Sequence, residues 1–330
     1  LNKERAQSVV GENPVAVTDS FEQVLADDSI DLIDVCLPPN LHLSAIVSAL
    51  EAGKNVISEK PLVASIAEAD QVLEACQRTG RHVFPVFQYR YGPGLDKLKA
   101  LVDGGLAGKA YSASLETHWN RGSDYYSVPW RGTWEGESGG AVLGHAIHIH
   151  DLLSFILGPI QSVTALTATR VNPIEVEDCA AIAFELSSGA VATSSVTLGA
   201  GTDTSRLRFC FEGFTATSGT NPYAPGQGAW TFEARAPMDQ SHLDSFLNNL
   251  TPRPAWFAGF FKAVAMALDG HPGREVTLED GRRSLEVVTA VYHSARTGHK
   301  VALPIDKEHP LYSGWQPEPL KHQQQSQQQQ

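Results

Sequence analysis

The first 92 residues alternate between short apolar runs and longer segments in which apolar residues recur at helical spacing. Apolar runs typical of buried strands occur at 30–37, 55–58 and 82–90. Helical spacing follows the first two runs over 41–53 and 65–80, and both of these segments end in glycine, a common helix terminator. This alternation predicts a parallel β-sheet that is covered by helices and connected by right-handed crossovers.

The pattern changes after residue 92. Several segments between 161 and 236 alternate between apolar and polar residues and are mostly separated by glycine turns, which predicts a mainly antiparallel sheet. Apolar residues occupy both parities in runs such as 181–186 and 206–211. We therefore expect helices to cover one face of this sheet and self-association to use the other. Helical spacing returns over 254–270 and 278–298, so an α/β domain is predicted to precede an α+β domain.

This organisation divides the chain into three parts. We predict an α/β domain over 1–92 and an α+β domain over 93–315. The glutamine-rich segment 316–330 is of low complexity, and we predict that it is a disordered tail.

Composition narrows the class of partner and the compartment. The formal net charge is −12, which disfavours binding to the phosphates of a nucleic acid. We find no run of about 18 apolar residues and therefore expect no membrane-spanning segment. The four cysteines have no CxxC spacing and lie in apolar contexts, which favours free thiols in a reducing, cytoplasmic compartment.

Polar residues and prolines stand at the ends of the three predicted strands of the first domain, at 37–42, 58–61 and 87–90. Ligands of an open parallel sheet bind outside the carboxyl ends of its strands, so these segments are candidate walls of a binding site. Lys60 lies in the second segment, directly after Glu59. Burial at such a rim lowers the pKa of a lysine, which could then exchange a proton with a hydroxyl or carbonyl group. The alternative is a surface lysine paired with Glu59.

A second polar cluster occupies 138–153, where two glycines precede three histidines. His145 and His148 are one helical turn apart and share a face, whereas His150 is rotated away. A general acid or base fits this spacing better than a metal site, because zinc-binding helices typically place histidines four residues apart and need further ligands. We predict no metal. The alternative for each histidine is a hydrogen-bonded, partly buried side chain, which we favour for His150.

A third segment, 118–136, holds three tryptophans, two tyrosines and two arginines in a composition typical of a loop. Aromatic walls with hydroxyl and guanidinium donors suit the binding of a small polar molecule. The alternative is a packed surface loop without a ligand.

Together these segments resemble the Gfo/Idh/MocA family of nicotinamide-dependent sugar and polyol oxidoreductases over residues 20–315. The most specific feature is the Glu-Lys-Pro triplet at 59–61 after a strand, followed by the Gly-Gly…His…Asp segment at 139–151. The runs 130–134 and 278–304 also look like this family. The resemblance implies a Rossmann-type, doubly wound parallel sheet and a second domain whose open sheet commonly forms oligomer contacts.

The resemblance also implies roles for single residues. His148 would be the base that accepts the substrate proton, and Lys60 would contact both the nicotinamide ribose and the substrate hydroxyl. We predict that Arg90, Tyr126 and His145 contact the substrate. The residues that would line an NAD or NADP cofactor are Pro38, Asn40, His42, Glu59, Lys60, Gln88, Trp130 and Arg131.

Two features depart from the family pattern. The family often has an aspartate four residues before the catalytic histidine, where this chain has Gly144. Something else must therefore orient His148, or His145 shares its role. No G-x-G-x-x-G turn, which would hold the cofactor pyrophosphate, occurs before residue 30. We therefore expect a first βαβ unit of about 30 residues to be missing at the N-terminus.

Functions from different classes are compatible with these observations. The first is a homo-oligomeric dehydrogenase or reductase that transfers hydride between NAD(P) and a secondary alcohol or ketone of a sugar, polyol or related small molecule. The presence of both Lys60 and His148 favours it. The second is a non-catalytic regulatory protein that binds dinucleotide or sugar, which Gly144 and the missing phosphate loop favour. A third is a relative that uses NAD for a transient oxidation, as in some glycosidases.

Overall fold

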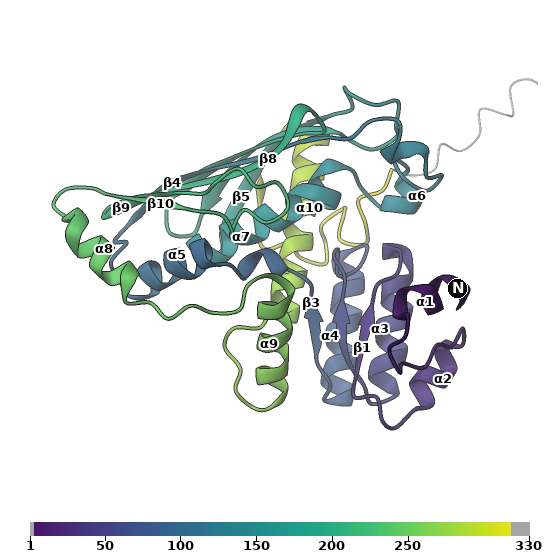
Figure 1. The fold of residues 1–330 in the computed structure, drawn as a ribbon. Helices are drawn as coiled ribbons and strands as arrows, with labels where there is room; N and C mark the ends of the chain where they lie inside the picture. Colours follow the sequence, from purple (N-terminus) through teal and green to yellow (C-terminus); the bar gives the residue numbers. More distant parts are fainter. Residues whose placement is uncertain (1–2, 318–330) are drawn as a thin grey trace, which may run out of the picture.

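The computed structural model describes residues 3–317, and its N-terminal part contains a three-stranded parallel sheet (Figure 1). Helices α3 (His42–Glu51) and α4 (Ile66–Thr79) connect successive strands. The predicted parallel sheet with helical crossovers is therefore confirmed. In their spatial order, the strands are β1 (Leu32–Val35), β2 (Asn55–Ser58) and β3 (Val83–Pro85).

Local signals in the sequence place the helix ends, whereas pairing sets the strand ends. Ser65 caps α4 through its side chain, and Gly80 closes the same helix with a left-handed φ of 67°. The third strand is shorter than predicted, because Pro85 already pairs with Ser58, the last residue of β2. The chain beyond it turns into the 3-10 helix η2 (Gln88–Arg90), which brings polar side chains to the end of the sheet.

The second part of the chain is built on an eight-stranded sheet with the order β10-β9-β8-β4-β7-β6-β5-β11. Its strand pairs are antiparallel except for β4 and β7, which run parallel. The predicted mainly antiparallel sheet is confirmed. Its strands are β4 (Ala110–Asn120), β5 (Ile160–Ala168), β6 (Cys179–Leu186), β7 (Val191–Thr197), β8 (Gly199–Phe211), β9 (Phe214–Thr217), β10 (Thr231–Ala234) and β11 (Val301–Ala302).

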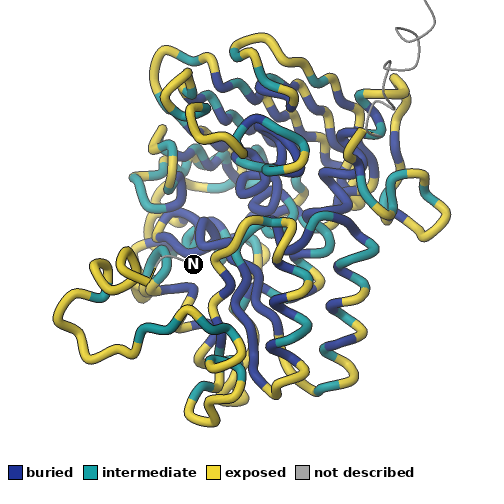
Figure 2. Tube along the Cα trace, turned by 90° about the vertical axis from the view of Figure 1, so that its right-hand side faces the viewer, coloured by how far each residue is buried: buried dark blue, intermediate teal, exposed yellow. Residues whose placement is uncertain are grey.

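Helices α5 (Pro93–Asp103), α7 (Ile147–Leu157) and α10 (Leu278–Thr297) lie on one face of the large sheet, the face on the side of the smaller sheet (Figure 1). Strands β6 and β7 alternate between buried and exposed residues. Figure 2 shows buried and exposed segments alternating in this way in the upper part of the molecule. Both parities of the run 181–186 carry apolar residues, and the structure shows which of them face outward. The outward apolar positions of β6 are Ala181 and Ala183, which are exposed and have small side chains.

The remaining elements are short or lie at the periphery. They are α1 (Lys3–Val10), α2 (Phe21–Ala26), η1 (Pro39–Leu41), η3 (Tyr125–Ser127), α6 (Trp134–Glu137), the π-helical η4 (Val142–Ala146), α8 (Gln240–Asn248) and α9 (Trp256–Leu268).

Helix α10 packs against both sheets. It lies against β5 and α7 of the second part and also against β3 and α4 of the first. A Cβ atom at Gly281 would lie 2.7 Å from the ring of Pro85, so the approach of this helix to β3 requires glycine. Arg282 forms an ion pair with Asp70 of α4 at 2.6 Å. The C-terminal helix thus completes the core of the N-terminal part, and the division at residue 92 stays a prediction.

The segment Trp134–Leu157 is long and apolar enough to cross a membrane by length and composition alone. In the fold, 83% of its most apolar window is buried inside the protein, as expected of a core helix. Of the predicted glutamine-rich tail, Gln316 is described and its side chain donates to the Ser138 hydroxyl at 3.3 Å. Residues 318–330 of that tail lie outside the described residues.

Candidate active site

A cavity of about 290 Å³ lies where the ends of β2 and β3 meet the helical segment that runs from η4 into α7. Two of the three strand ends predicted from sequence therefore face a common cavity. From the first part of the chain it is lined by Lys60, Gln88 and Tyr89, and from η4 and α7 by Gly144, His145 and His148. The other wall consists of Trp119, Arg121, Tyr125, Tyr223 and Trp256.

Lys60 crosses from the small sheet to the helical segment on the other side of the cavity. Its Nζ donates a hydrogen bond to the Gly144 carbonyl at 2.5 Å. Loss of hydration lowers the pKa of Lys60, and the carboxylates of Glu59 and Glu137 oppose this effect. A lysine with a lowered pKa, anchored at a fixed point, can donate to a substrate oxygen and exchange a proton with it.

His145 and His148 are buried in the cavity wall, and burial lowers the pKa of both well below the usual value. The charge on Lys60 acts in the same direction, so both imidazoles are neutral and can accept a proton. The Nδ1 atoms of both rings lack a hydrogen-bond partner among the described residues. Tyr89 stacks on the ring of His148 with 4.3 Å between centroids, which fixes its plane. His150 instead contacts the Ser194 hydroxyl at 3.0 Å, the buried role that we favoured for it.

A π-helical turn, η4, precedes α7 and carries Gly144 and His145. Such turns are frequent at functional sites, because they change the helical register and re-aim side chains. A Cβ atom added at Gly144 would meet nothing within 4 Å, so this position leaves open space beside Lys60. Within residues 3–317, no group of three or more His, Cys, Asp or Glu side chains is arranged to hold a metal ion.

A buried carboxylate holds the start of this helical segment. Glu177, on the loop before β6, accepts hydrogen bonds from the backbone N–H groups of Gly140 at 3.2 Å and Val142 at 2.9 Å. Tyr292 of α10 donates its hydroxyl to the same carboxylate at 2.9 Å. A Cβ atom at Gly140 would lie 1.9 Å from the Glu177 carbonyl oxygen, which explains the glycine. The position of the histidines therefore depends on Glu177.

The structure brings some of the predicted cofactor residues near the cavity. Arg131 lies over the ring of Tyr125, 3.9 Å from its centroid, and pairs with Glu137 at 3.6 Å. Trp130 is 44% exposed. The Glu59 carboxylate accepts from the backbone N–H of Lys60 at 3.1 Å. Pro38 and Asn40 lie at η1, after β1, outside the cavity lining.

Three residues that were predicted to contact the cofactor or the substrate, His42, Arg90 and Tyr126, lie outside the cavity lining. His42 is buried, with its Nδ1 2.9 Å from the Pro61 carbonyl and its Nε2 2.8 Å from the Leu37 carbonyl, so neither nitrogen is free for a cofactor. Arg90 lies outside the lining. It pairs with Asp151 at 2.6 Å and with Asp280 at 2.9 Å, because its charge is buried and needs both carboxylates.

Tyr126 is also outside the lining, and its neighbour Tyr125 takes that place. Sequence reasoning did not single out the other aromatic and cationic residues of the far wall. The aromatic and arginine content of 118–136 was a signal for Trp119 and Arg121, whereas Tyr223 and Trp256 lie outside that segment and had none. Trp256 has a φ of 59°, rare for a bulky residue, and stacks on Tyr89 with 5.4 Å between centroids.

Comparison with known families gives two matches along the chain. The model described as "Oxidoreductase family, NAD-binding Rossmann fold" matches residues 1–87, and the "GFO/IDH/MocA C-terminal domain" model matches residues 95–217. Among curated proteins, the uncharacterized oxidoreductase sll0816 of Synechocystis is 28% identical over 55% of this chain and 53% of the relative. YrbE of Bacillus subtilis, also an uncharacterized oxidoreductase, is 29% identical over 53% of this chain and 51% of the relative. The chain thus spans about half the length of the curated relatives it matches.

Solved structures resemble nearly the whole chain. The WlbA dehydrogenase from Bordetella pertussis, in complex with NADH and UDP-GlcNAcA, is 28% identical with a TM-score of 0.81, covering 92% of this chain and 88% of that one. Levoglucosan dehydrogenase, in complex with NADH and levoglucosan, has a TM-score of 0.74 over the same shares, and its 21% identity supports the fold alone.

Proposed function

Because the chain belongs to the Gfo/Idh/MocA family, whose N-terminal domain is an NAD-binding Rossmann fold, we propose that it is an NAD(P)-dependent dehydrogenase or reductase. It transfers hydride between the cofactor and a secondary alcohol or ketone of a sugar, polyol or related small molecule. WlbA, which is 28% identical, was crystallised with NADH and a nucleotide sugar, which supports a substrate of this kind.

The observation that carries the proposal is that Lys60 and His148 line one cavity from opposite sides of the fold. The two residues are far apart in sequence: Lys60 follows strand β2 of the small sheet, and His148 lies on helix α7. Both have a lowered pKa, and the positive charge of Lys60 contributes to the shift at His148. A pair of proton-handling groups in one cavity is typical of an acid–base site.

In the oxidation direction, the neutral imidazole of His148 accepts the proton of the substrate hydroxyl. Lys60 donates a hydrogen bond to the same oxygen and stabilises the negative charge that develops on it. The nicotinamide, when bound, supplies the acceptor for the hydride that leaves the carbon. Tyr89 holds the His148 ring in plane, and the bond from Lys60 to the Gly144 carbonyl keeps the ammonium at the cavity wall.

The residues that would hold the cofactor fit a nicotinamide in one respect. The Oε1 atom of Gln88 is buried in the cavity wall without a donor among the described residues, so it can accept from a carboxamide N–H. We retain the cofactor contacts that were predicted from the sequence, except for His42, because its ring nitrogens already contact carbonyl groups. The proposed cofactor contacts are Pro38, Asn40, Glu59, Lys60, Gln88, Trp130 and Arg131.

The test measures reduction of NAD and NADP, through the near-ultraviolet absorbance of the reduced nicotinamide, with a panel of sugars, polyols and sugar nucleotides. Lys60→Ala and His148→Asn should abolish most turnover, and calorimetric titration of His148→Asn should show that cofactor binding persists. His242→Ala, at an exposed histidine on α8, is the matched control and should retain full activity. Turnover that survives both active-site substitutions would show that the proton-transfer groups lie elsewhere.

Gly144 supports a second candidate function. Without an acidic side chain at this position, the cavity could hold a dinucleotide or a sugar without turnover, as in a non-catalytic regulatory protein. Micromolar binding of cofactor and sugar, together with no turnover over the whole panel, would favour this candidate over the enzyme.

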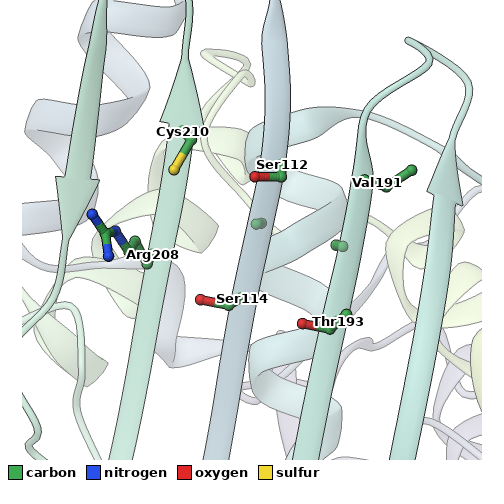
Figure 3. A pocket seen from close by; sticks show the side chains of 8 residues that line it. Ser112, Ser114, Val191, Thr193, Arg208 and Cys210 are labelled. Atoms are coloured by element: carbon green, nitrogen blue, oxygen red, sulfur yellow. The ribbon is translucent and has the colours of Figure 1, made fainter. Parts of the chain in front are cut away.

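We further propose that the chain forms homo-oligomers in the cytoplasm through the open face of the large sheet. Figure 3 shows this face over β4, β7 and β8, where short side chains such as Ser114 and Thr193 surround a shallow cavity of about 230 Å³. All four cysteines are free thiols, which fits a reducing compartment. Ser114→Glu and Thr193→Glu should lower the mass measured by light scattering, whereas Ser241→Glu on α8 should not. A monomer at micromolar concentration in the unaltered protein would contradict the proposal.

A further inference from the structure

The charged side chains that line the active-site cavity are all cationic. They are Lys60 and Arg121, and no Asp or Glu is among the lining residues. The positive charge of the cavity lining is opposite in sign to the formal net charge of the chain, which is −12. The acids near Lys60 are Glu59 and Glu137, which act on it from outside the lining. A cavity with cations on its surface favours a ligand of negative charge.

Arg121 has unused hydrogen-bonding capacity. Its Nη1 donates to the Asn120 carbonyl at 2.5 Å and to Asp203 at 2.9 Å, and its Nη2 donates to the Tyr223 hydroxyl at 2.8 Å. A guanidinium has five N–H donors. The Nε–H and the second hydrogen of Nη2 have no acceptor among the described residues. Tyr223 also donates to the Asp203 oxygen that Nη1 binds, so these partners share the Nη1/Nη2 edge and the two remaining donors lie on the other edge of the planar group. Two parallel donors on one edge match the two oxygens of a carboxylate.

The surroundings of Arg121 hold this group in place before any ligand binds. The guanidinium lies over the rings of Trp119 at 4.9 Å and Tyr125 at 5.4 Å, and the side chain is only 12% exposed. Asp203 orients the guanidinium and offsets part of its charge, but it does not line the cavity. An arginine fixed in this way loses little conformational entropy on binding an anion.

Gly144 adds an independent observation from the opposite wall. It lines the cavity beside Lys60, and a Cβ atom added there would meet nothing within 4 Å. The chain therefore places no side chain in this space, and none of its own carboxylates enters the cavity to neutralise Lys60. The space remains for a group of the ligand, in a wall whose nearest charge is positive.

We propose that the substrate is an acid whose carboxylate binds the free edge of Arg121 while its reacting hydroxyl lies between Lys60 and His148. This inference rests on the proposed function, and it narrows the substrate class from sugars and polyols in general to sugar acids and related hydroxy acids. The carboxylate replaces the hydration that Arg121 and Lys60 lose in the cavity.

The experiment compares ligands that differ only in the anionic group. Calorimetric titrations with NADH present use two matched pairs, D-glucuronate against D-glucose and UDP-glucuronate against UDP-glucose. The acid of at least one pair should have a Kd at least about 10-fold lower than its neutral partner, as expected for charge-assisted hydrogen bonds. Equal binding within each pair, or no binding of either acid, would overturn the proposal. Tighter binding of glucose 6-phosphate than of glucuronate would assign the site to phosphate esters instead.

Two sets of variants test the residues directly. Arg121→Met should remove the preference for the acid and leave the Kd of the neutral partner within about 3-fold, because only the charge-assisted bonds are lost. Gly144→Asp should weaken binding of the acid by repulsion, whereas Gly144→Asn, of the same size and without charge, should not. An unchanged acid preference in Arg121→Met, or equal effects of the two Gly144 variants, would refute the assignment.

The proposed function can fail separately from this inference. Titration with NAD and NADP alone, without any acid, tests the cofactor site. A protein that binds neither cofactor but still prefers the acids would contradict the dehydrogenase and leave the carboxylate site intact. A protein that oxidises neutral polyols as well as the matched acids would support the dehydrogenase and contradict the carboxylate site.

Discussion

The buried carboxyl group of Glu177 should make the stability of the protein depend on pH in a way that a single substitution removes. Glu177 is 5% exposed, and burial raises its pKa from 4.5 to about 7. Hydrogen bonds from Val142, Gly140 and Tyr292 oppose this shift without cancelling it. The folded protein therefore holds the proton of this group more tightly than the unfolded chain does.

The size and direction of the effect follow from the difference between a pKa of 4.5 in the unfolded chain and about 7 in the folded protein. At 1.36 kcal/mol for each unit, the difference between the protonation states is about 3 kcal/mol. Because the pKa is higher in the folded state, this contribution is fully present below pH 4.5 and is lost as the pH rises to 7 and beyond. Glu177→Gln has no group that titrates here, so its stability should lack this loss of about 3 kcal/mol.

The assay is calorimetric unfolding of both proteins at about pH 5 and about pH 8, between which most of the shift is expressed. In Glu177→Gln, the NH₂ group of the amide faces the backbone N–H of Gly140 or Val142. This contact lowers the stability of the variant by the same amount at both pH values. The Tm of Glu177→Gln minus the Tm of the unaltered protein should therefore be several degrees higher at pH 8 than at pH 5. Glu135→Gln, at an exposed position on α6, is the control and should show no such gain. A Tm difference that is the same at both pH values would refute the reasoning.

Lys60→Ala should lower kcat by about 100-fold or more with a confirmed substrate, the scale of a lost acid–base group, and unchanged turnover would contradict its role. Arg90→Met should destabilise the protein by about 3–5 kcal/mol in denaturant unfolding, because the buried carboxylate of Asp151 loses its ion pair and Asp280 keeps only its pair with Arg283 at 3.4 Å. A loss below about 1 kcal/mol would show that solvent reaches the cluster. Gly140→Ala should prevent stable folding, since its Cβ atom would lie 1.9 Å from a carbonyl oxygen, whereas Gly144→Ala should unfold within a few degrees of the unaltered protein. The reverse order of stability for these two alanine variants would show that the start of the helical segment is misplaced.

The sequence was a good guide where the deciding interactions are local. The cap at Ser65 and the left-handed Gly80 mark the ends of α4, and both signals lie within the helix or next to it. The strand ends around Lys60 and Gln88 could be predicted as walls of a site, because parallel strands end at one edge of their sheet. The shared face of His145 and His148 also follows from helical spacing.

Interactions between distant segments could not be read in the same way. Arg90 sits at a strand end like the true cavity residues, but its partners are 61 and 190 positions away, and only the fold brings them to it. The far wall of the cavity combines Trp119, Tyr223 and Trp256, which come from three separate segments without any common motif. Sequence spacing within one segment carries no information about which side chains converge in this way.

Because α10 packs against both sheets, it affects how the chain folds during its synthesis. Synthesis runs from the N-terminus, so β3 leaves the ribosome about 200 residues before Gly281, which packs against Pro85. During that interval β3 lacks the cover that α10 gives it, and Arg282, which pairs with Asp70, has not yet been made. We expect the N-terminal part to stay loosely packed until translation is nearly finished, and chaperones that shield nascent chains to raise the yield of native protein. A ribosome stalled before residue 278 should therefore display a protease-sensitive chain.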